Sequence, residues 1–172
     1  TLHKNLLKKL KYKGEVVITK GVGIINKPKI DVIKREYKKR YLFIGRLSKE
    51  KNIEKLVDIF NDLEGWELTI IGTGPLDQRL KSKAKKNISF IGKVKNENLK
   101  QYFQRHDITI LPSISETWGL VVEEALYFGM PVIVSNNCGV SELIKEGING
   151  YIFDLRDIGS VKDIILNINN NT

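Results

Sequence analysis

The sequence predicts an α/β fold, a doubly wound Rossmann-like parallel sheet of about six strands with helices on both faces. Two observations predict it. Six short runs alternate with helical segments from residue 41 onward, and each run is mostly apolar with at most one Ser or Thr. Parallel strands require crossover helices and are buried on both faces, which explains both features. A chain of 172 residues is long enough to form one such core.

The expected elements follow one another as strand, loop and helix. The apolar runs predict strands at 41–44, 68–71, 88–91, 108–111, 132–135 and 151–153. Apolar residues at helical spacing, with flanking Gly and Pro, predict helices at 53–63, 75–86, 96–105, 118–128, 140–146 and 158–168. Before this domain we expect a basic amphipathic helix at 2–10, a strand at 15–19 and a linker at 24–40 with a short helix near 32–37.

The net charge of +9 is concentrated at the N-terminal end. Residues 1–40 hold 13 Lys and Arg against three acids, whereas residues 41–172 hold 16 against 17. A nearly neutral body argues against a domain-wide surface for polyphosphates, and we expect no nucleic-acid partner. A noncatalytic basic nucleic-acid-binding module remains an alternative because of the basic N-terminal segment.

The N-terminal helix at 2–10 has two interpretations. Its leucines and lysines would suit an anionic membrane surface, or the leucines would pack on protein and leave the lysines solvated; we favour packing. The single cysteine, Cys138, has no disulfide partner, and no apolar run approaches the roughly 20 residues that span a bilayer. We therefore expect a cytoplasmic protein, peripheral on the inner face of the plasma membrane if the first interpretation holds.

In doubly wound sheets, ligands bind where loops leave the carboxyl ends of the strands. The first such loop begins at Gly45 and presents Arg46 and Lys51 ahead of a helix. A guanidinium fork, an ammonium point charge and helix-terminal amides together suit a diphosphate. The alternative is that both cations are solvated loop residues, and Lys49 is the expected bystander.

The second loop, at 72–75, contains Gly74 and Pro75. Glycine allows a close backbone approach, and proline is tolerated in the first turn of a helix. The loop lacks the full G-x-G-x-x-G pattern, so it does not predict a dinucleotide site.

The third loop, at 112–124, is the most informative. Glu116 precedes a helix whose first turn contains Gly119 and Leu120, so a carboxylate and free amides would face one cleft. Glu124 follows one turn after Leu120, where its carboxylate could accept hydrogen bonds from ribose hydroxyls. In the alternative interpretation, Glu116 is only a helix N-terminal charge and Glu124 a solvated residue.

These loops, in this order, resemble the retaining GT-B glycosyltransferases, in particular glycosyltransferase family 4. The resemblance runs from residue 41 to about residue 157 and rests on G-R-L-x-x-x-K at 45–51, G-x-G-P at 72–75 and E-x7-E at 116–124. The segments 124–133 and 138–150 continue it. No single motif is decisive, but their ordered combination is specific.

The resemblance implies a role for each matching position. Arg46 and Lys51 would bind and neutralise the departing diphosphate, and Glu116 would lie by the donor sugar. The remaining donor contacts would come from Gly45, Gly74, Pro75, Val94, Gly119, Leu120 and Glu124, with Glu124 on the ribose and the loop at 92–94 beside the base. The donor would be a UDP-, GDP- or ADP-linked sugar, and no metal is expected because the chain contains no Asp-x-Asp.

The family's architecture also implies what surrounds this domain. Residues 1–23 would be the tail of a missing N-terminal domain that supplies the site for a glycan or lipid-linked acceptor, and 41–172 the nucleotide-sugar-binding domain. We expect this piece alone to be inactive or nearly so, and the intact enzyme to be a hexosyltransferase of polysaccharide or glycolipid assembly. Lys20-Gly21-Val22-Gly23 replaces the usual Asn-Gly-Val-Asp, and Val140 replaces a common Gly. A sugar-nucleotide epimerase of similar architecture is the alternative enzyme.

Overall fold

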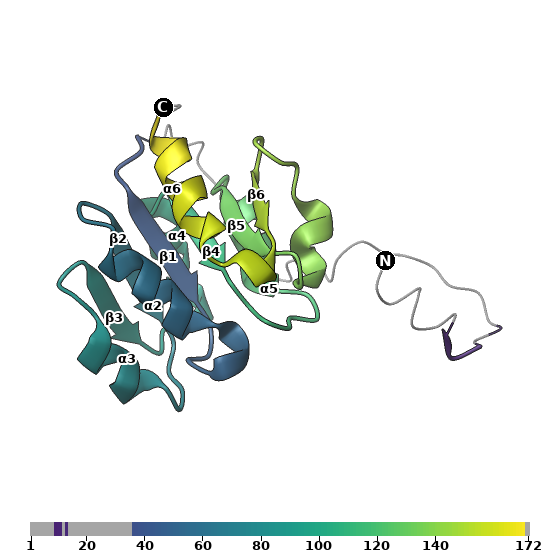
Figure 1. The fold of residues 1–172 in the computed structure, drawn as a ribbon, viewed down its shortest axis with the longest axis horizontal. Helices are drawn as coiled ribbons and strands as arrows, with labels where there is room; N and C mark the ends of the chain where they lie inside the picture. Colours follow the sequence, from purple (N-terminus) through teal and green to yellow (C-terminus); the bar gives the residue numbers. More distant parts are fainter. Residues whose placement is uncertain (1–8, 12, 14–35, 171–172) are drawn as a thin grey trace.

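The computed structural model describes residues 9–11, 13 and 36–170, and within them a single six-stranded parallel sheet forms the centre (Figure 1). The strand order is β3-β2-β1-β4-β5-β6, so the chain builds outward from β1 on one side and then from β4 on the other. The strands are β1 (Arg40–Ile44), β2 (Glu67–Ile71), β3 (Ile88–Gly92), β4 (Ile108–Leu111), β5 (Val132–Ser135) and β6 (Gly150–Phe153). This confirms the predicted fold class.

The helices cover both faces of the sheet. In Figure 1, α2, α3 and α6 lie in front of the sheet and α4 and α5 lie behind it. The crossovers from β1 to β3 run across the sheet in one direction and those from β3 to β5 in the other, so right-handed connections place their helices on opposite faces. The helices are α2 (Ile53–Asn61), α3 (Asp77–Lys83), α4 (Lys100–Arg105), α5 (Leu120–Tyr127) and α6 (Ser160–Asn170). Four 3-10 turns accompany them: η1 (Lys49–Lys51), η2 (Asn96–Asn98), η3 (Gly139–Leu143) and η4 (Leu155–Asp157).

Burial explains why the strand predictions succeed. Every residue of β4 and β5 is buried, and both strands have the predicted bounds. The other four strands begin or end within one residue of their predicted bounds. Helix α2 buries Ile53, Leu56, Val57 and Phe60 on one face, which is the amphipathic pattern that predicted it.

The helix predicted at 96–105 consists of η2 followed by α4, and two other predicted helices differ because of neighbouring loops. The one at 75–86 is shorter at both ends, because the Leu76 N–H donates to the Leu47 carbonyl at its start and the Lys85 N–H donates to Asn61 Oδ1 at its end. The one at 140–146 is instead η3, whose Gly139 and Val140 N–H groups donate to carbonyls of the β4–α5 loop. In both cases a neighbouring loop takes the hydrogen bonds that a longer helix would use.

Residues just before β1 are tied to the sheet. The buried carboxylate of Asp107 accepts hydrogen bonds from the Lys38 and Arg40 N–H groups at 2.9 and 2.8 Å, and from the Arg40 guanidinium at 3.1 Å. The expected linker at 24–40 therefore contributes Arg40 to β1. The helix predicted at 2–10, the strand at 15–19 and the short helix near 32–37 lie largely outside the described residues, as does the Lys20–Gly23 segment.

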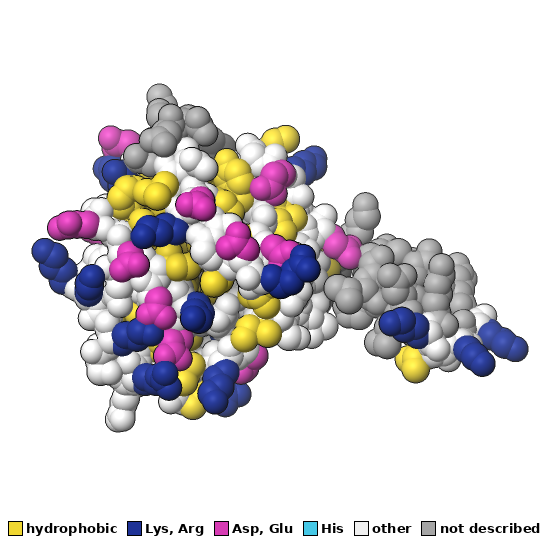
Figure 2. Space-filling model, in the orientation of Figure 1, with side chains coloured by type: hydrophobic (Ala, Val, Ile, Leu, Met, Phe, Trp, Pro, Cys, Tyr) yellow, Lys and Arg dark blue, Asp and Glu magenta, His cyan; other side chains and the backbone are white. Residues whose placement is uncertain are grey.

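Charges of both signs mix on the face shown in Figure 2. On α2 and α3, Arg79 and Lys83 form ion pairs with Glu54, and Lys83 also pairs with Asp58. This alternation agrees with the nearly neutral charge of residues 41–172.

Candidate functional site

The candidate site lies at the carboxyl edge of the sheet, where β1 and β4 diverge. Ile44 at the end of β1 pairs with Ile71, and Ile71 pairs with Gly92. The loops after these three strands therefore begin side by side at the same edge of the sheet. Two hollows occupy this edge and share Ile44 as a common wall. This is the switch point at which doubly wound sheets bind their ligands.

The two hollows take their lining from different loops. The Arg46 hollow, of about 490 Å³, is lined by Ile44, Gly45, Arg46, Ile71, Gly72, Thr73, Gly74, Lys93, Val94 and Leu99. The Glu116 hollow, of about 380 Å³, is lined by Ile44, Lys51, Leu111, Glu116, Thr117, Trp118, Gly119, Leu120 and Val121. Eight of the ten donor residues expected from the sequence therefore line one hollow or the other.

The loop after β1 is held by the loop after β2. The Gly45 N–H donates to the Ile71 carbonyl at 3.0 Å, and the Leu47 N–H donates to the Thr73 carbonyl at 3.1 Å. These bonds fix the backbone on both sides of Arg46, whose side chain lines the first hollow. A cation on a braced loop is better preorganised for an anion than one on a free loop.

The glycines of the second loop explain this bracing. A Cβ at Gly72 would lie 1.9 Å from the Gly45 carbonyl oxygen, and one at Gly74 would lie 2.4 Å from the Leu47 carbonyl oxygen. Glycine is thus needed here for the approach of the β1 loop. Pro75 lines neither hollow and lies two residues before α3, so the expectation that it occupies the first helical turn is wrong.

The loop after β4 brings Glu116 to Lys51. The Lys51 ammonium forms an ion pair with Glu116 Oε2. The Ile114 N–H donates to the Glu50 carbonyl at 2.8 Å, which joins the same two loops through their backbones. On its other side, the Glu116 carbonyl accepts a hydrogen bond from the Gly139 N–H at 3.0 Å. Glu116 is therefore fixed between two loops.

Gly119 begins α5 in a conformation that requires glycine. Its φ is +102°, and a Cβ there would lie 2.9 Å from a Leu111 methyl and 3.2 Å from a Val140 methyl. Val140, which replaces a glycine common in the resembled family, thus places a buried side chain beneath this turn. The first N–H groups of α5, including those of Leu120 and Val121, have no intrahelical partner and lie at the second hollow. They give the hollow positive partial charge.

Glu124 lies one turn further along α5 and lines neither hollow. Burial raises the pKa of its half-buried carboxyl, and a hydrogen bond with Asn96 opposes that rise. Asn96 begins η2 in the connection after β3, two residues beyond Val94 of the first hollow. Glu124 therefore faces the same connection that the sequence suggested for the base.

The sequence reasoning placed the loop at 92–94 beside the base but did not single out Lys93 within it. Lys93 and Arg46 both line the first hollow, and neither forms an ion pair within the described ranges. Lys93 follows directly on the end of β3, so the rule applied to the other strand ends would have found it. Thr73 and Thr117 also bring hydroxyls to the two hollows.

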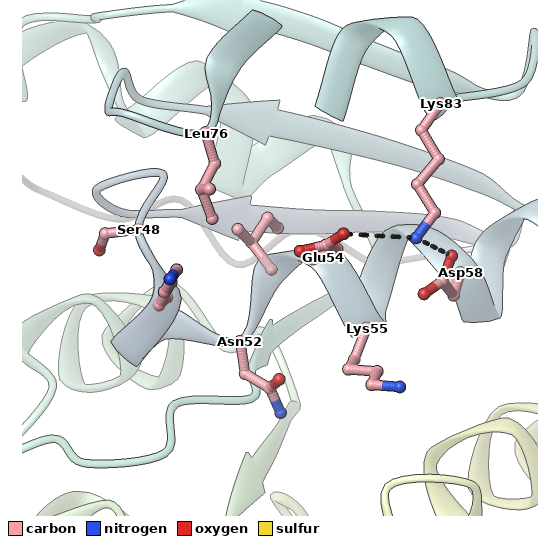
Figure 3. Close-up of a pocket in the computed structure, with 9 residues that line it drawn as sticks. Ser48, Asn52, Glu54, Lys55, Asp58, Leu76 and Lys83 are labelled. Carbon is pink, nitrogen blue, oxygen red and sulfur yellow. Dashed lines mark ion pairs between the residues drawn. The ribbon is translucent and has the colours of Figure 1, made fainter. Parts of the chain in front are cut away.

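Another hollow lies on the outer side of α2 (Figure 3). Lys49 is among the residues that line it, and Figure 3 shows Asn52 at one end and Lys83 bridging Glu54 and Asp58 at the other. The ion pairs of Lys83 with Glu54 and Asp58 join α3 to α2. Lys49 lines this outer hollow and neither of the other two, which agrees with its expected role as a bystander.

Both ring nitrogens of His106 form hydrogen bonds to other residues of the domain. Its Nδ1 lies 2.8 Å from the Tyr102 carbonyl, and its Nε2 lies 2.8 Å from the Thr69 hydroxyl. Because a carbonyl only accepts, Nδ1 carries the proton and Nε2 accepts from Thr69. Burial lowers the pKa of His106, which favours the neutral imidazole at this position.

With this geometry established, comparison with known proteins identifies the family. The sequence model of the family Glycosyl transferases group 1 matches residues 26–172. The chain belongs to this family. In the described part of the chain, no group of three or more His, Cys, Asp and Glu could hold a metal ion, and no helix is long and apolar enough to cross a bilayer.

Curated relatives extend well beyond this chain. An uncharacterized 41.2 kDa protein in the cps region of Klebsiella pneumoniae is 30% identical over 158 residues, which cover 87% of this chain and 44% of that protein. Alpha-monoglucosyldiacylglycerol synthase of Acholeplasma laidlawii is 34% identical over 122 residues, which cover 66% of this chain and 31% of that enzyme. The chain spans less than half the length of these relatives.

A solved structure agrees with the fold. HepE of Anabaena, crystallised with UDP, matches with a TM-score of 0.68 and 21% identity over 77% of this chain and 39% of that chain. At this identity the likeness shows the fold alone, which is one Rossmann-like half of a GT-B glycosyltransferase.

Proposed function

We propose that this chain is the donor-binding half of a retaining glycosyltransferase of family 4, which transfers a hexosyl group from a nucleotide diphosphate. One observation carries the proposal. Arg46, Lys51 and the N-terminus of α5 converge on two adjoining hollows at the switch point of the sheet. Such a convergence of cations and free amides suits a diphosphate.

The proposed chemistry follows from the charges that develop in the reaction. When the bond between the anomeric carbon and the diphosphate oxygen breaks, negative charge gathers on the diphosphate and positive charge on the sugar ring. Arg46, Lys51 and the amides at Gly119 and Leu120 would stabilise the first charge, and one such donor is worth about 3 kcal/mol in a transition state. Glu116 would face the sugar, and the acceptor would attack from the face that the diphosphate leaves, with retention.

The nucleoside end would occupy the Arg46 hollow. Gly45, Gly74 and Val94 line it, and Glu124 faces the connection after β3 from the other side. We propose that Glu124 accepts hydrogen bonds from the ribose hydroxyls and that the loop at 92–94 contacts the base. Pro75 would act indirectly, by supporting the turn before α3. UDP, GDP and ADP remain candidates; UDP is the nucleotide in the HepE structure. We propose that no metal takes part.

The acceptor and the second half of the site lie outside this chain in the proposal. A glycan or lipid-linked acceptor would bind to a preceding domain, of which residues 1–23 would be the tail and 24–40 the linker. The name of the Acholeplasma relative supports a lipid acceptor. We further propose that the isolated piece is inactive or nearly so, and that the intact enzyme acts in the cytoplasm, where residues 2–10 could contact an anionic membrane. Membership of the group 1 family favours neither the epimerase nor the nucleic-acid-binding module.

Thermal unfolding with nucleotides tests the proposal. The chain is melted with UDP, GDP, ADP and CMP in turn, alongside the Arg46→Ala and Glu124→Ala variants. A ligand at 100 times its dissociation constant stabilises the folded state by about 2.7 kcal/mol, which raises the melting temperature of a chain of this size by about 5 to 10 °C. We expect one nucleotide to give this shift and both variants to lose it.

Lys49→Ala is the matched control, because it removes a cation from the same loop but from the outer hollow. It should keep the full shift. A shift that survives in Arg46→Ala, or that disappears equally in Lys49→Ala, would refute the assignment of the diphosphate site.

A further inference from the structure

Lys51 and Glu116 are both proposed to contact the donor, but in this structure they form an ion pair with each other. The Lys51 ammonium bonds to Glu116 Oε2, and the two side chains are only 20% and 19% exposed. In this state the Lys51 charge is neutralised by protein. Arg46 and Lys93, in the adjoining hollow, form no ion pair in the described part of the chain.

The backbone holds these two partners close together whether or not they are paired. The bond from the Ile114 N–H to the Glu50 carbonyl ties the loop of Glu116 to the turn of Lys51, and Gly139 fixes the Glu116 carbonyl from the other side. Both side chains line the Glu116 hollow, where the α5 N-terminus also lies. An anion entering this hollow therefore meets a lysine that already has a carboxylate partner.

We propose that Glu116 and the donor diphosphate compete for Lys51, so that donor binding moves the ammonium from the carboxylate to the diphosphate and frees Glu116 for the sugar. This inference rests on the proposed function and describes how that same site is regulated. Lysine suits the exchange because its ammonium is a point charge on a flexible stem, which can change partners by side-chain rotation alone.

The exchange has different consequences for a nucleotide and for a nucleotide sugar. A nucleoside diphosphate takes Lys51 and leaves the partly buried Glu116 carboxylate without a partner, which opposes binding. A nucleotide sugar also takes Lys51, but its sugar hydroxyls can donate hydrogen bonds to the freed carboxylate. The pair therefore discriminates against the product nucleotide relative to the donor.

Calorimetric binding of UDP and UDP-glucose to the chain tests this, with GDP and GDP-mannose or ADP and ADP-glucose used instead if the nucleotide scan selects another base. Glu116→Gln keeps the shape of the side chain and removes its charge. We expect it to bind the nucleotide about five- to tenfold more tightly, as for the loss of a partly buried competing ion pair. It should bind the nucleotide sugar with a smaller gain or a loss.

Two comparisons separate competition from a general charge effect. Glu142→Gln removes the same charge from the exposed side of η3, outside both hollows, and should leave both affinities unchanged. In a Lys51→Met background, Glu116→Gln should no longer tighten nucleotide binding, because the contested ammonium is gone.

The outcomes distinguish the two proposals. Competition for Lys51 is wrong, and the donor site stands, if the wild type binds a nucleotide and Glu116→Gln binds it no more tightly. The same holds if Glu116→Gln increases nucleotide affinity equally in the Lys51→Met background. If neither the wild type nor any variant binds a nucleotide, the donor site in this chain is wrong, and the competition falls with it.

Discussion

Replacing Gly74 with alanine should destabilise the domain through contact alone. Gly74 does not have a positive φ, so its backbone conformation is open to alanine. The added Cβ, however, would lie 2.4 Å from the Leu47 carbonyl oxygen and 2.7 Å from the Leu47 carbonyl carbon and nitrogen. These are backbone atoms, which cannot rotate aside as a side chain can, so one of the two loops must move.

The expected cost follows from overpacking. Insertion of a carbon into a well-packed contact costs about 1–3 kcal/mol, and each kcal/mol lowers the melting temperature by about 2–4 °C for a domain of this size. We therefore expect a fall of about 2–12 °C. The displaced loop also bears Arg46, so the variant should lose nucleotide affinity as well as stability.

Melting curves with and without the selected nucleotide measure both effects. Gly159→Ala is the control, because its Cβ would have only Asp157 Oδ1 nearby, at 3.4 Å, and its φ is not positive. It should melt at or slightly above the wild type, since Gly→Ala at a permissive site stabilises by about 0.4–1 kcal/mol. The reasoning is refuted if Gly74→Ala melts together with Gly159→Ala.

Three further predictions concern single side chains. Asp107→Ala should cost at least about 2 kcal/mol in urea unfolding, because it leaves two backbone N–H groups and a guanidinium without their buried acceptor; an unchanged midpoint would contradict this. The lowered pKa of His106 means that its stabilising contribution is present above about pH 6.5 and lost as the pH falls below that value. The wild type should therefore lose more stability than His106→Gln between pH 7 and pH 5, and parallel pH curves would refute this. Lys93→Ala should weaken nucleotide binding in calorimetry by about threefold or more, whereas Lys86→Ala, which removes the same charge at the opposite edge of the sheet, should not; equal losses would show only a general charge effect.

Sequence periodicity was sufficient for the six strands because burial in a parallel sheet leaves a local pattern in the sequence. A strand that is buried on both faces is mostly apolar, so β4 and β5, which each carry a single hydroxyl residue, could be located to the residue. The same rule directed attention to the strand ends, and the family resemblance assigned donor contacts there; eight of those ten residues line the two hollows. Charge counting likewise needed no structure to separate a basic N-terminal segment from a neutral body.

The features that only the tertiary structure decided depend on contacts between distant loops. Lys51 and Glu116 are 65 residues apart, and no local pattern indicates that they pair. The sequence suggested that Gly72 and Gly74 allow a close approach to a ligand. In the structure, the backbone that approaches them is the loop after β1. The strand order, the early end of the helix at 75–86 and the 3-10 turn at Gly139 likewise follow from hydrogen bonds between loops. The sequence alone therefore determined which elements form and which loops face the site, because burial and periodicity are local, whereas the packing of those loops decided which charges meet.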